Sequence, residues 1–276
     1  MYNKTSLTRF AATVAKLAGV EKPACADEGL DWVCDVLTDV CKDGFDRVLI
    51  HNPDAMGMFL YEKYPDMFEP VLKHTQLTVP LRSPMPSWTP VCFATMYTGA
   101  EPAVHGIQKY EKPIIRIDTL FDALIRAGKK VAILATAEKS SMATIFRERD
   151  MDIITFESEG QLIDRAQDLI IEDSYDVLIV YTIRYDFLEH RQGPEGPNAL
   201  AAAYRECTIF DQLVSTVKRN WTNHNTLIAF APDHGVHRNP DGTVNSKGLP
   251  LLGDHGTDAP EDLNILHYFG AVLRKS

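Results

Sequence analysis

Five short apolar runs constrain the fold of this chain more than any other feature. Continuous apolar runs of this length are typical of strands buried on both faces, as in parallel sheets. Segments with helix-like apolar spacing alternate with them. The alternation predicts an α/β fold, with a doubly wound, mostly parallel central sheet and helices on both faces. The runs are RVLI (47–50), KVAILA (130–135), MDIITF (151–156), DVLIVYT (176–182) and TLIAFA (226–231), and the helical segments are 55–64, 90–97, 118–127, 159–172 and 197–220.

The first 44 residues precede this alternation and have a different pattern. Apolar residues recur at helical spacing over 5–19 and 27–42, and Gly44 follows the second segment as a helix stop. We therefore expect an N-terminal helical extension over 1–44 that packs on one core domain over 45–276.

Charge and composition exclude several classes of function. The net charge of -10 argues against a protein that binds a nucleic-acid polymer through a basic face. No apolar run approaches the roughly 18 to 20 residues that span a bilayer, so we expect no membrane role. The five cysteines are odd in number and form no Cys-x-x-Cys pair, and the N-terminus lacks the apolar core of a signal peptide. These features predict a reduced, cytoplasmic protein.

Three of the apolar runs lead into an aspartate, at Asp54, Asp186 and Asp233. The carboxyl ends of parallel strands meet at one edge of a doubly wound sheet, which is where ligands bind. A single aspartate in such a loop is commonly a helix N-cap. Here, however, His190 follows Asp186 by four residues and His234 follows Asp233 directly. Carboxylate with imidazole is a ligand set for zinc or a similar divalent ion, so the combination predicts a metal site.

A Thr-Pro step at Thr89 precedes an apolar helical segment that stops at Gly99. One interpretation is structural, with Thr89 as the N-cap and Pro90 at the first helical position. The other is functional, because a helix N-terminus binds phosphate-like anions and stabilises an alkoxide on a hydroxyl located there. Threonine is a weak nucleophile that metal coordination can activate. Thr89 is therefore a candidate nucleophile if a metal lies beside it.

Taken together, these residues resemble the alkaline phosphatase superfamily, and within it the type I phosphodiesterase/nucleotide pyrophosphatase branch. That family has an aspartate after its first core strand, which Asp54 matches. Its nucleophile stands ten residues before the glycine of a Thr-Gly step, as Thr89 does before Gly99, and a motif like PAVHGI (102–107) follows. An Asp-x-x-x-His element, an Asp-His-Gly and a final His-Gly then come in order, and the matching residues are Asp186 with His190, Asp233 to Gly235, and His255 with Gly256.

The resemblance implies two metal sites and a mechanism. Asp54, Asp233 and His234 would bind the metal that also holds Thr89, and the other metal would have the ligands Asp186, His190 and His255. Family members generally use zinc there, and some use manganese or another divalent ion. The implied reaction is in-line attack by the threonine on phosphorus, followed by hydrolysis of the phosphothreonine, with two metals that clamp the attacking and leaving oxygens.

This chain departs from the family in two places. Only residues 235–254 separate His234 from the last histidine, His255, so the cap that shapes the substrate pocket in many relatives is reduced. The position of a phosphate-binding asparagine in many phosphodiesterases reads QKYEK (108–112). Lys109 and Tyr110 are candidates to replace it, although both also suit a solvated loop. Lys139 in TAEKSS is a further candidate, because its loop resembles the lysine-bearing loop of phosphonoacetate hydrolases.

The function that the resemblance implies is a two-metal-dependent hydrolase of small phosphate esters, either diesters or monoesters, that acts through a phosphothreonine. One alternative is a hydrolase of C-P bonds like phosphonoacetate hydrolase, which would use the same residues. Another is a metal-binding relative without turnover. Diester, monoester and phosphonate substrates all stay open at this level, as does the oligomeric state.

Overall fold

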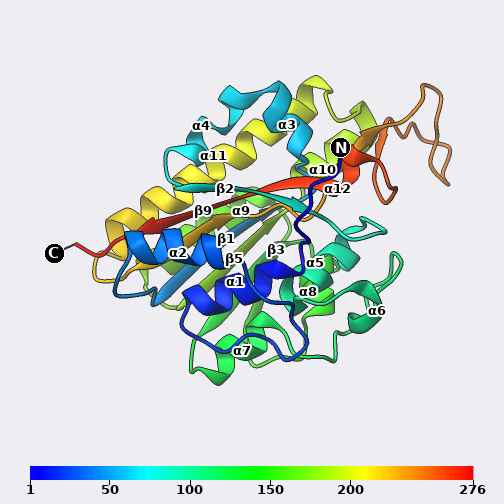
Figure 1. Cartoon of the computed structure of the whole chain (residues 1–276). Helices are drawn as coiled ribbons and strands as arrows, with labels where there is room; N and C mark the ends of the chain where they lie inside the picture. Colours follow the sequence, from blue (N-terminus) through cyan, green and yellow to red (C-terminus); the bar gives the residue numbers. More distant parts are fainter. Residues whose placement is uncertain (276) are drawn as a thin grey trace.

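A seven-stranded sheet in the order β2-β9-β6-β1-β5-β3-β4 runs through the computed structural model, which describes residues 1–275 (Figure 1). Strands β1, β3, β4, β5 and β6 pair in parallel with their neighbours, and β9 pairs antiparallel with both β6 and β2. The predicted mostly parallel α/β sheet is thus confirmed. The strands are β1 (Arg47–Pro53), β2 (Leu77–Arg82), β3 (Val131–Thr136), β4 (Asp152–Phe156), β5 (Val177–Thr182), β6 (Thr226–Phe230) and β9 (Asn264–Val272).

Helices cover both faces of the sheet, and alternate strand residues feed the two apolar layers. Val48 and Ile50 of β1 belong to one layer, whereas Leu49 between them belongs to the other. The first layer is covered by α1 (Arg9–Leu17), α2 (Asp31–Val40), α5 (Thr89–Thr98), α7 (Leu120–Arg126) and α8 (Ser141–Ile145). The second is covered by α3 (Met58–Lys63), α4 (Glu69–Leu72), α9 (Glu159–Ile171), α10 (Arg184–Gln192) and α11 (Pro197–Asn220). Short elements complete the chain: the 3-10 helix η1 (Pro65–Phe68), α6 (Pro102–His105) and α12 (Pro260–Leu263).

Local sequence signals explain where several helices start and stop. Thr119 and Asp122 form a reciprocal capping box at the start of α7. Pro197 occupies the first turn of α11, where a proline loses no helical hydrogen bond. Gly99 ends α5 with a φ of 69°, a left-handed conformation that favours glycine. All five helical segments expected between the strands are present, with ends that differ by a few residues.

Two strands of the main sheet, β2 and β9, were not among the predicted apolar runs. β2 is an edge strand in which buried Val79 and Leu81 alternate with exposed neighbours, so it has no continuous apolar run. Its Pro80 is tolerated because an edge strand has one side without ladder hydrogen bonds. β9 contains a histidine and a glycine, His267 and Gly270, which interrupt its apolar pattern.

The N-terminal segment forms the two expected helices, and both contribute to the first apolar layer. Phe10 of α1 and Val33 of α2 are buried in the same cluster as Val48 of β1. The backbone N-H of Leu7 also donates to the carbonyl of Arg82 at the end of β2. Residues 1–44 therefore pack on the sheet, and the division of the chain at residue 44 stays a prediction.

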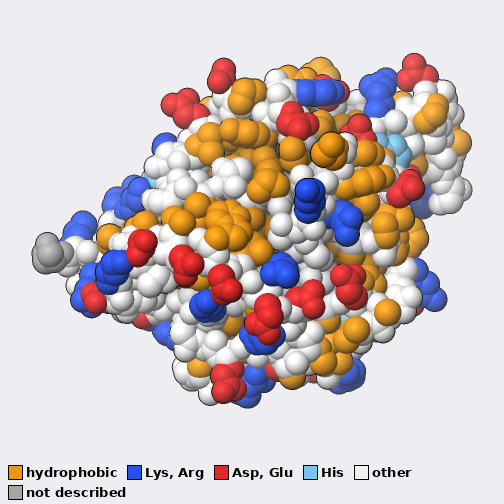
Figure 2. Space-filling model, viewed as in Figure 1, with side chains coloured by type: hydrophobic (Ala, Val, Ile, Leu, Met, Phe, Trp, Pro, Cys, Tyr) orange, Lys and Arg blue, Asp and Glu red, His pale blue; other side chains and the backbone are white. Residues whose placement is uncertain are grey.

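Apolar, basic and acidic side chains are mixed on the face of the molecule seen in Figure 2. Apolar side chains of α2 reach the solvent, and basic groups lie among acidic ones over the same face. Within residues 1–275, no helix combines the length and the apolar content needed to cross a bilayer.

The carboxyl edge of the sheet carries the loops after β1, β5 and β6. Between β6 and His255 the described residues form only the short ribbon β7 (His237–Arg238) and β8 (Gly253–Asp254), and the loop between these two strands projects from the molecule (Figure 1). The reduction of the cap relative to the family stays a prediction.

Candidate metal centre

The six predicted metal ligands form two groups of three at the carboxyl edge of the sheet. In each group the ligand atoms lie within 4.8 Å of one another. The first group, which we call the nucleophile trio, is Asp54, Asp233 and His234. Asp54 follows β1 directly, and the other two follow β6. The second, which we call the outer trio, consists of Asp186 and His190 on α10 and His255 after β8.

The nucleophile trio is fully enclosed and touches Thr89. Nε2 of His234 lies 3.3 Å from Oδ1 of Asp54 and 3.4 Å from Oδ2 of Asp233. The hydroxyl oxygen of Thr89 lies 3.1 Å from the same nitrogen. The protein holds the remaining oxygen of each carboxylate, because the Tyr181 hydroxyl donates to Asp54 Oδ2 and the Ala55 N-H donates to Asp233 Oδ1. Each carboxylate thus turns its other oxygen toward His234.

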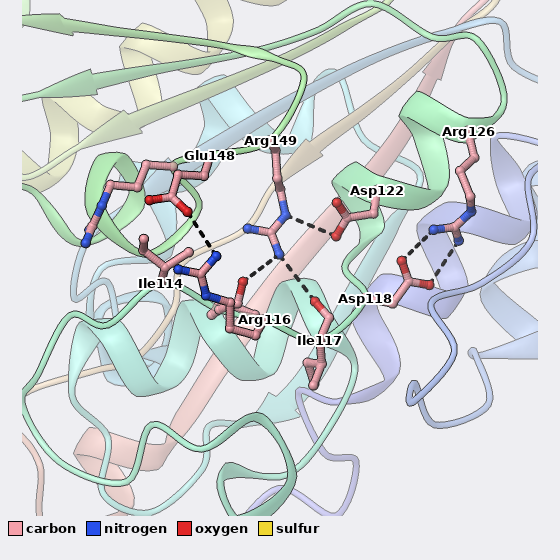
Figure 3. A pocket seen from close by; sticks show the side chains of 10 residues that line it. Ile114, Arg116, Ile117, Asp118, Asp122, Arg126, Glu148 and Arg149 are labelled. Atoms are coloured by element: carbon pink, nitrogen blue, oxygen red, sulfur yellow. Dashed lines mark hydrogen bonds and ion pairs between the residues drawn. The ribbon is translucent and has the colours of Figure 1, made fainter.

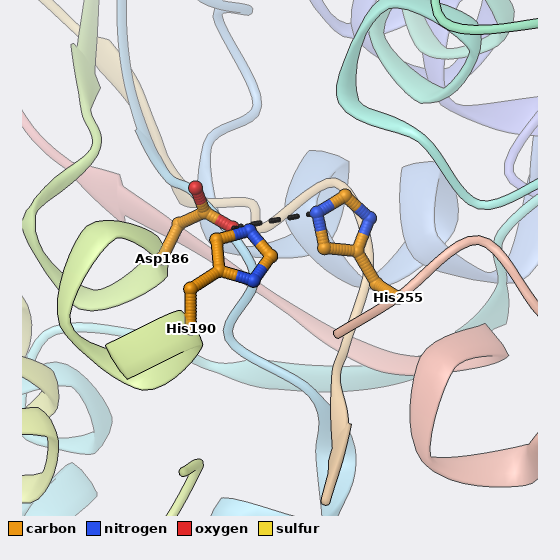
Figure 4. Close-up of side chains that lie close together, drawn as sticks. All are labelled: Asp186, His190 and His255. Atoms are coloured by element: carbon orange, nitrogen blue, oxygen red, sulfur yellow. Dashed lines mark ion pairs between the residues drawn. The ribbon is translucent and has the colours of Figure 1, made fainter. Parts of the chain in front are cut away.

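The outer trio has the same character but is more open to solvent. Nε2 of His190 and Nε2 of His255 each lie 3.5 Å from Oδ1 of Asp186, as Figure 4 shows. The spacing of Asp186 and His190 on one side of α10 is the i, i+4 relation that the sequence predicted. The rings of His234 and His255 stack with centroids 4.0 Å apart, so the two trios are neighbours.

Backbone carbonyls set the tautomer of all three histidines. Nδ1 of His190 lies 2.9 Å from the Gly253 oxygen, Nδ1 of His255 lies 2.9 Å from the Ser87 oxygen, and Nδ1 of His234 lies 3.0 Å from its neighbour's carbonyl. A carbonyl can only accept, so Nδ1 must carry the hydrogen. When the imidazole is neutral, Nε2 then has the lone pair and faces the carboxylates, as metal coordination requires.

The carboxylates supply an independent test of whether metal fits. Within residues 1–275, one buried oxygen of each aspartate has no hydrogen-bond partner: Oδ1 of Asp54, Oδ1 of Asp186 and Oδ2 of Asp233. These are the same oxygens that face the histidines. A buried carboxylate oxygen without a partner is costly, and a cation would satisfy it. Oxygen and imidazole donors in these numbers suit zinc or manganese.

Electrostatics in the metal-free protein point the same way. Burial, and then repulsion from neighbouring carboxylates, raises the pKa of Asp54 and of Asp233 well above the usual range. Burial lowers the pKa of His234 well below its usual value, and the positive His255 adds to this effect. Burial would also lower the pKa of His255, but contact with Asp186 raises it to about 9. The site crowds acidic groups into a dry space, and cations would relieve the repulsion.

The start of α5 differs from the expected capping arrangement. Trp88, with extended backbone angles, is the N-cap, and Thr89 is the first helical residue with Pro90 after it. The expectation that Thr89 caps the helix is therefore wrong by one position. Its hydroxyl contacts His234 instead of a backbone N-H of the helix. The structural interpretation of Thr89 loses its basis, and the functional one gains a contact.

Comparison with known proteins identifies the fold. No protein-family model and no curated protein matches the chain. Among solved structures, murine ectonucleotide pyrophosphatase/phosphodiesterase 5 matches with a TM-score of 0.63 and 14% identity over 83% of this chain and 89% of that chain. The human ectonucleotide pyrophosphatase/phosphodiesterase 5 matches with a TM-score of 0.57 and 14% identity, over 82% of this chain and 87% of that chain. Phosphonoacetate hydrolase from Sinorhizobium meliloti, in complex with phosphonoacetate, gives 0.52 and 18% over 75% of this chain and 60% of that chain. The chain has an alkaline phosphatase-like fold.

Within this alkaline phosphatase-like fold, the three weaker candidates for substrate contact lie in different settings. The side chain of Lys109 is 71% exposed and its ammonium is 3.4 Å from Glu111. The side chain of Lys139 is exposed, and its backbone carbonyl accepts a hydrogen bond. Tyr110 approaches the centre, since its ring lies edge-on to Trp88 with centroids 6.4 Å apart. Of the three, only Tyr110 is in contact with a residue that adjoins Thr89.

Sequence reasoning missed three residues that bear on the site. Tyr181 holds Asp54, as described above. Buried Glu189 places a carboxylate oxygen 3.0 Å from Nδ1 of His190. Lys112 is half-buried and feels the charge of Asp54. Lys112 stood in the QKYEK segment, but the sequence cannot tell which of its two lysines turns inward. Tyr181 and Glu189 carry no signal apart from their place beside motif residues.

A pocket that none of the six ligands lines is seen in Figure 3. Three of its arginines pair with carboxylates: Arg116 with Glu148, Arg126 with Asp118, and Arg149 with Asp122. Because these arginines are paired, the pocket has little net charge to attract an anionic ligand. The two trios are therefore the stronger candidate site.

Proposed function

We propose that this protein is a two-metal-dependent hydrolase of small phosphate esters in which Thr89 is the nucleophile. The observation that carries the proposal is the 3.1 Å contact between the Thr89 hydroxyl and Nε2 of His234. It places a hydroxyl at a helix N-terminus and against a buried trio of metal-binding side chains. If Thr89 served only to start the helix, nothing would require the trio or the unpaired carboxylate oxygens beside its hydroxyl.

The two trios would hold the ions, zinc in preference and manganese as the alternative. Asp54, Asp233 and His234 would bind the ion beside Thr89, and the outer trio would bind the second. When bound, two divalent ions lower the pKa of a coordinated hydroxyl or water and neutralise charge on the phosphoryl group.

The residues of the chain supply the rest of the reaction. The Thr89 hydroxyl gives up its proton to water, its oxygen attacks phosphorus, the ester oxygen leaves with its electron pair and takes up a proton from water, and a phosphothreonine forms. Pro90 has no N-H, and the N-H groups of Val91 and Cys92 donate to the Trp88 carbonyl, so the backbone N-H of Thr89 is the group at the start of α5 that would donate to a phosphoryl oxygen. A water then attacks the same phosphorus, which restores the Thr89 hydroxyl and releases the phosphate product.

The solved structures support a small phosphorylated substrate. The murine phosphodiesterase was solved as an inactive threonine-to-alanine variant in complex with AMP. Phosphonoacetate hydrolase was solved with phosphonoformate and with phosphonoacetate. The phosphonate complexes keep C-P bond hydrolysis as the alternative reaction, because the same trios and threonine would serve it. A relative without turnover is disfavoured by the intact contact of Thr89 with His234.

A cytoplasmic location is also part of the proposal. It rests on five cysteines that are all unpaired, four of them buried, as expected of a reducing compartment. The murine and human neighbours bear names with the prefix ecto. Reactivity of the exposed Cys25 toward a thiol reagent in intact cells would test the location.

The decisive experiment replaces Thr89. In Thr89→Ala we expect hydrolysis of bis-p-nitrophenyl phosphate and p-nitrophenyl phosphate to fall by about a thousandfold or more, with metal content unchanged. Thr89→Ser, which keeps a hydroxyl, should retain measurable turnover. Acid-quenched wild-type reactions should contain a phosphorylated peptide that includes Thr89, as detected by mass spectrometry. Full activity of the alanine variant with both metals bound would refute the nucleophile.

A further inference from the structure

Lys112 is a half-buried cation next to the centre that has no carboxylate partner within 4.0 Å among residues 1–275. Its ammonium donates to the carbonyl of Lys139 at 2.7 Å and lies 5.4 Å from the ring centre of Tyr110. Burial lowers the pKa of Lys112, while the charge of Asp54 acts in the opposite direction. One carbonyl satisfies one of the three N-H groups, so this ammonium has donors to spare.

Aromatic side chains connect Lys112 to both trios. The Tyr110 ring, over which the ammonium lies, meets Trp88 edge-on at 6.4 Å. Trp88 immediately precedes Thr89, and its indole also rests against Gly256, where an added Cβ would come within 2.0 Å of the indole nitrogen. Gly256 in turn follows His255. Burial raises the pKa of the Tyr110 hydroxyl, with a contribution from the charges of Asp54 and Asp186. Lys112 therefore lies over an aromatic pair that contacts Gly256, the neighbour of His255, and that adjoins Thr89 through Trp88.

Charge balance indicates what such a cation would recognise. This step rests on the proposed function, with two divalent ions bound. With the Thr89 hydroxyl counted as neutral, the three aspartates of the trios and two divalent ions leave one net positive charge. A phosphodiester monoanion cancels that charge, whereas a phosphomonoester dianion leaves one negative charge over. Lys112 supplies the positive charge that the dianion lacks.

We propose that Lys112 is a substrate-binding residue that makes this site favour dianionic phosphoryl substrates, namely phosphate monoesters and phosphonates, over phosphodiesters. Its ammonium donates a charge-assisted hydrogen bond to a phosphoryl oxygen. Such bonds are shorter and stronger than neutral ones, and their strength grows with the charge of the acceptor.

The test compares one monoester and one diester on the metal-loaded protein. In Lys112→Ala, kcat/KM for p-nitrophenyl phosphate should fall at least about tenfold, as expected for one charge-assisted bond. For bis-p-nitrophenyl phosphate the fall should stay under about threefold, because the monoanion gains less from the cation. Lys112→Arg should restore most of the loss. The matched control is Lys42→Ala, which removes the same charge from a lysine that is 70% exposed and precedes β1, and it should change neither substrate.

A binding measurement separates this proposal from the hydrolase proposal. By calorimetry, metal-loaded Thr89→Ala should bind inorganic phosphate about ten times more tightly than the Thr89→Ala, Lys112→Ala double variant. If the wild-type protein hydrolyses neither substrate, the hydrolase proposal fails, and the two phosphate affinities still decide the role of Lys112. The role given to Lys112 would be overturned if Lys112→Ala lowered kcat/KM equally for the monoester and the diester. It would also be overturned if Thr89→Ala and the double variant bound phosphate equally tightly.

Discussion

The two Asp-His-Gly tripeptides place their aspartates in different environments. Asp233 is fully buried, with one oxygen turned toward His234 and unpaired. Asp254 lies in β8 and is half-buried, and its carboxylate accepts the backbone N-H of His255 at 2.9 Å. The first aspartate is placed to hold a cation, and the second only shapes the turn that carries His255.

Replacing these two aspartates should therefore give unequal results. We expect Asp233→Asn to weaken binding of one metal ion by at least about a hundredfold, because it removes a charged ligand and not merely a partner of a ligand. Asp254→Asn should bind two ions as the wild type does. Metal content after dialysis against a limiting chelator, measured by plasma emission, is the readout. Equal losses in the two variants would show that the division of roles is wrong.

At the scale of helices and strands, two neighbouring glutamates lie on α9 and α11: Glu206 is buried and Glu159 is partly buried. The Thr182 hydroxyl at the end of β5 donates to Glu206 of α11 at 2.6 Å, and His51 of β1 lies 3.3 Å from the same oxygen. Glu159 opens α9 beside them. Burial raises the pKa of Glu206 to about 7, and burial together with the charge of Glu206 raises that of Glu159 to about 7. His51 stays neutral, because burial lowers its pKa to about 3.

The sign of the resulting pH dependence follows from these directions. A carboxyl whose pKa is raised on folding binds protons more tightly in the folded protein, so its stability is full below its ordinary pKa near 4.5 and is lost as pH rises through about 7. A glutamine at position 206 does not ionise, so Glu206→Gln should not lose this part of the folding stability as pH rises. We expect the variant to gain on the order of 2 kcal/mol relative to the wild type between pH 5 and pH 8. Urea unfolding of the metal-free proteins at both pH values measures it, and a difference that does not change with pH would contradict the prediction.

The elements that sequence predicts best are the continuous apolar strands. The five apolar runs became the five parallel strands: β1, β3, β5 and β6 are buried almost throughout, and β4 is an edge strand of mostly half-buried residues. β2 was not predicted because its buried residues alternate with exposed ones. β9 was not predicted because His267 and Gly270 interrupt its apolar pattern. At the site, spacing and order picked out six side chains that the structure brings together as two trios, with Thr89 beside one of them, because strand ends bring distant motifs to one edge. Lys112 and Tyr181 could not be found this way, since which side of a loop or strand faces the centre depends on packing.

On the scale of the whole molecule, the two trios tie together loops that come from distant parts of the chain. Asp54 follows β1, Asp186 and His190 lie on α10, Asp233 and His234 follow β6, and His255 follows β8. A cation that binds only when these segments are assembled stabilises the folded state by mass action.

Removing metal should therefore lower the melting temperature of the whole protein. For a chain of this size, about 1 kcal/mol of lost binding energy lowers Tm by roughly 2 to 4 °C, so full chelation should shift it by several degrees. Scanning calorimetry before and after chelation, with zinc restored as a control, gives the value. Asp233→Asn should show a smaller shift than the wild type. Identical melting of metal-loaded and metal-free wild type would count against metal sites in these trios.

The position of β9 between β6 and β2 also has a consequence for synthesis on the ribosome. β2 has no other strand neighbour, so it cannot join the sheet until residues 264–272 have emerged. The N-terminal segment, which bonds to Arg82 at the end of β2, must wait as well. The segment that leads from β2 into α5 and Thr89 is thus seated only late in translation, after a long-range pairing that is slow to form. A nascent chain that stalls before β9 would contain all six trio residues yet lack the strand that fixes Thr89 among them.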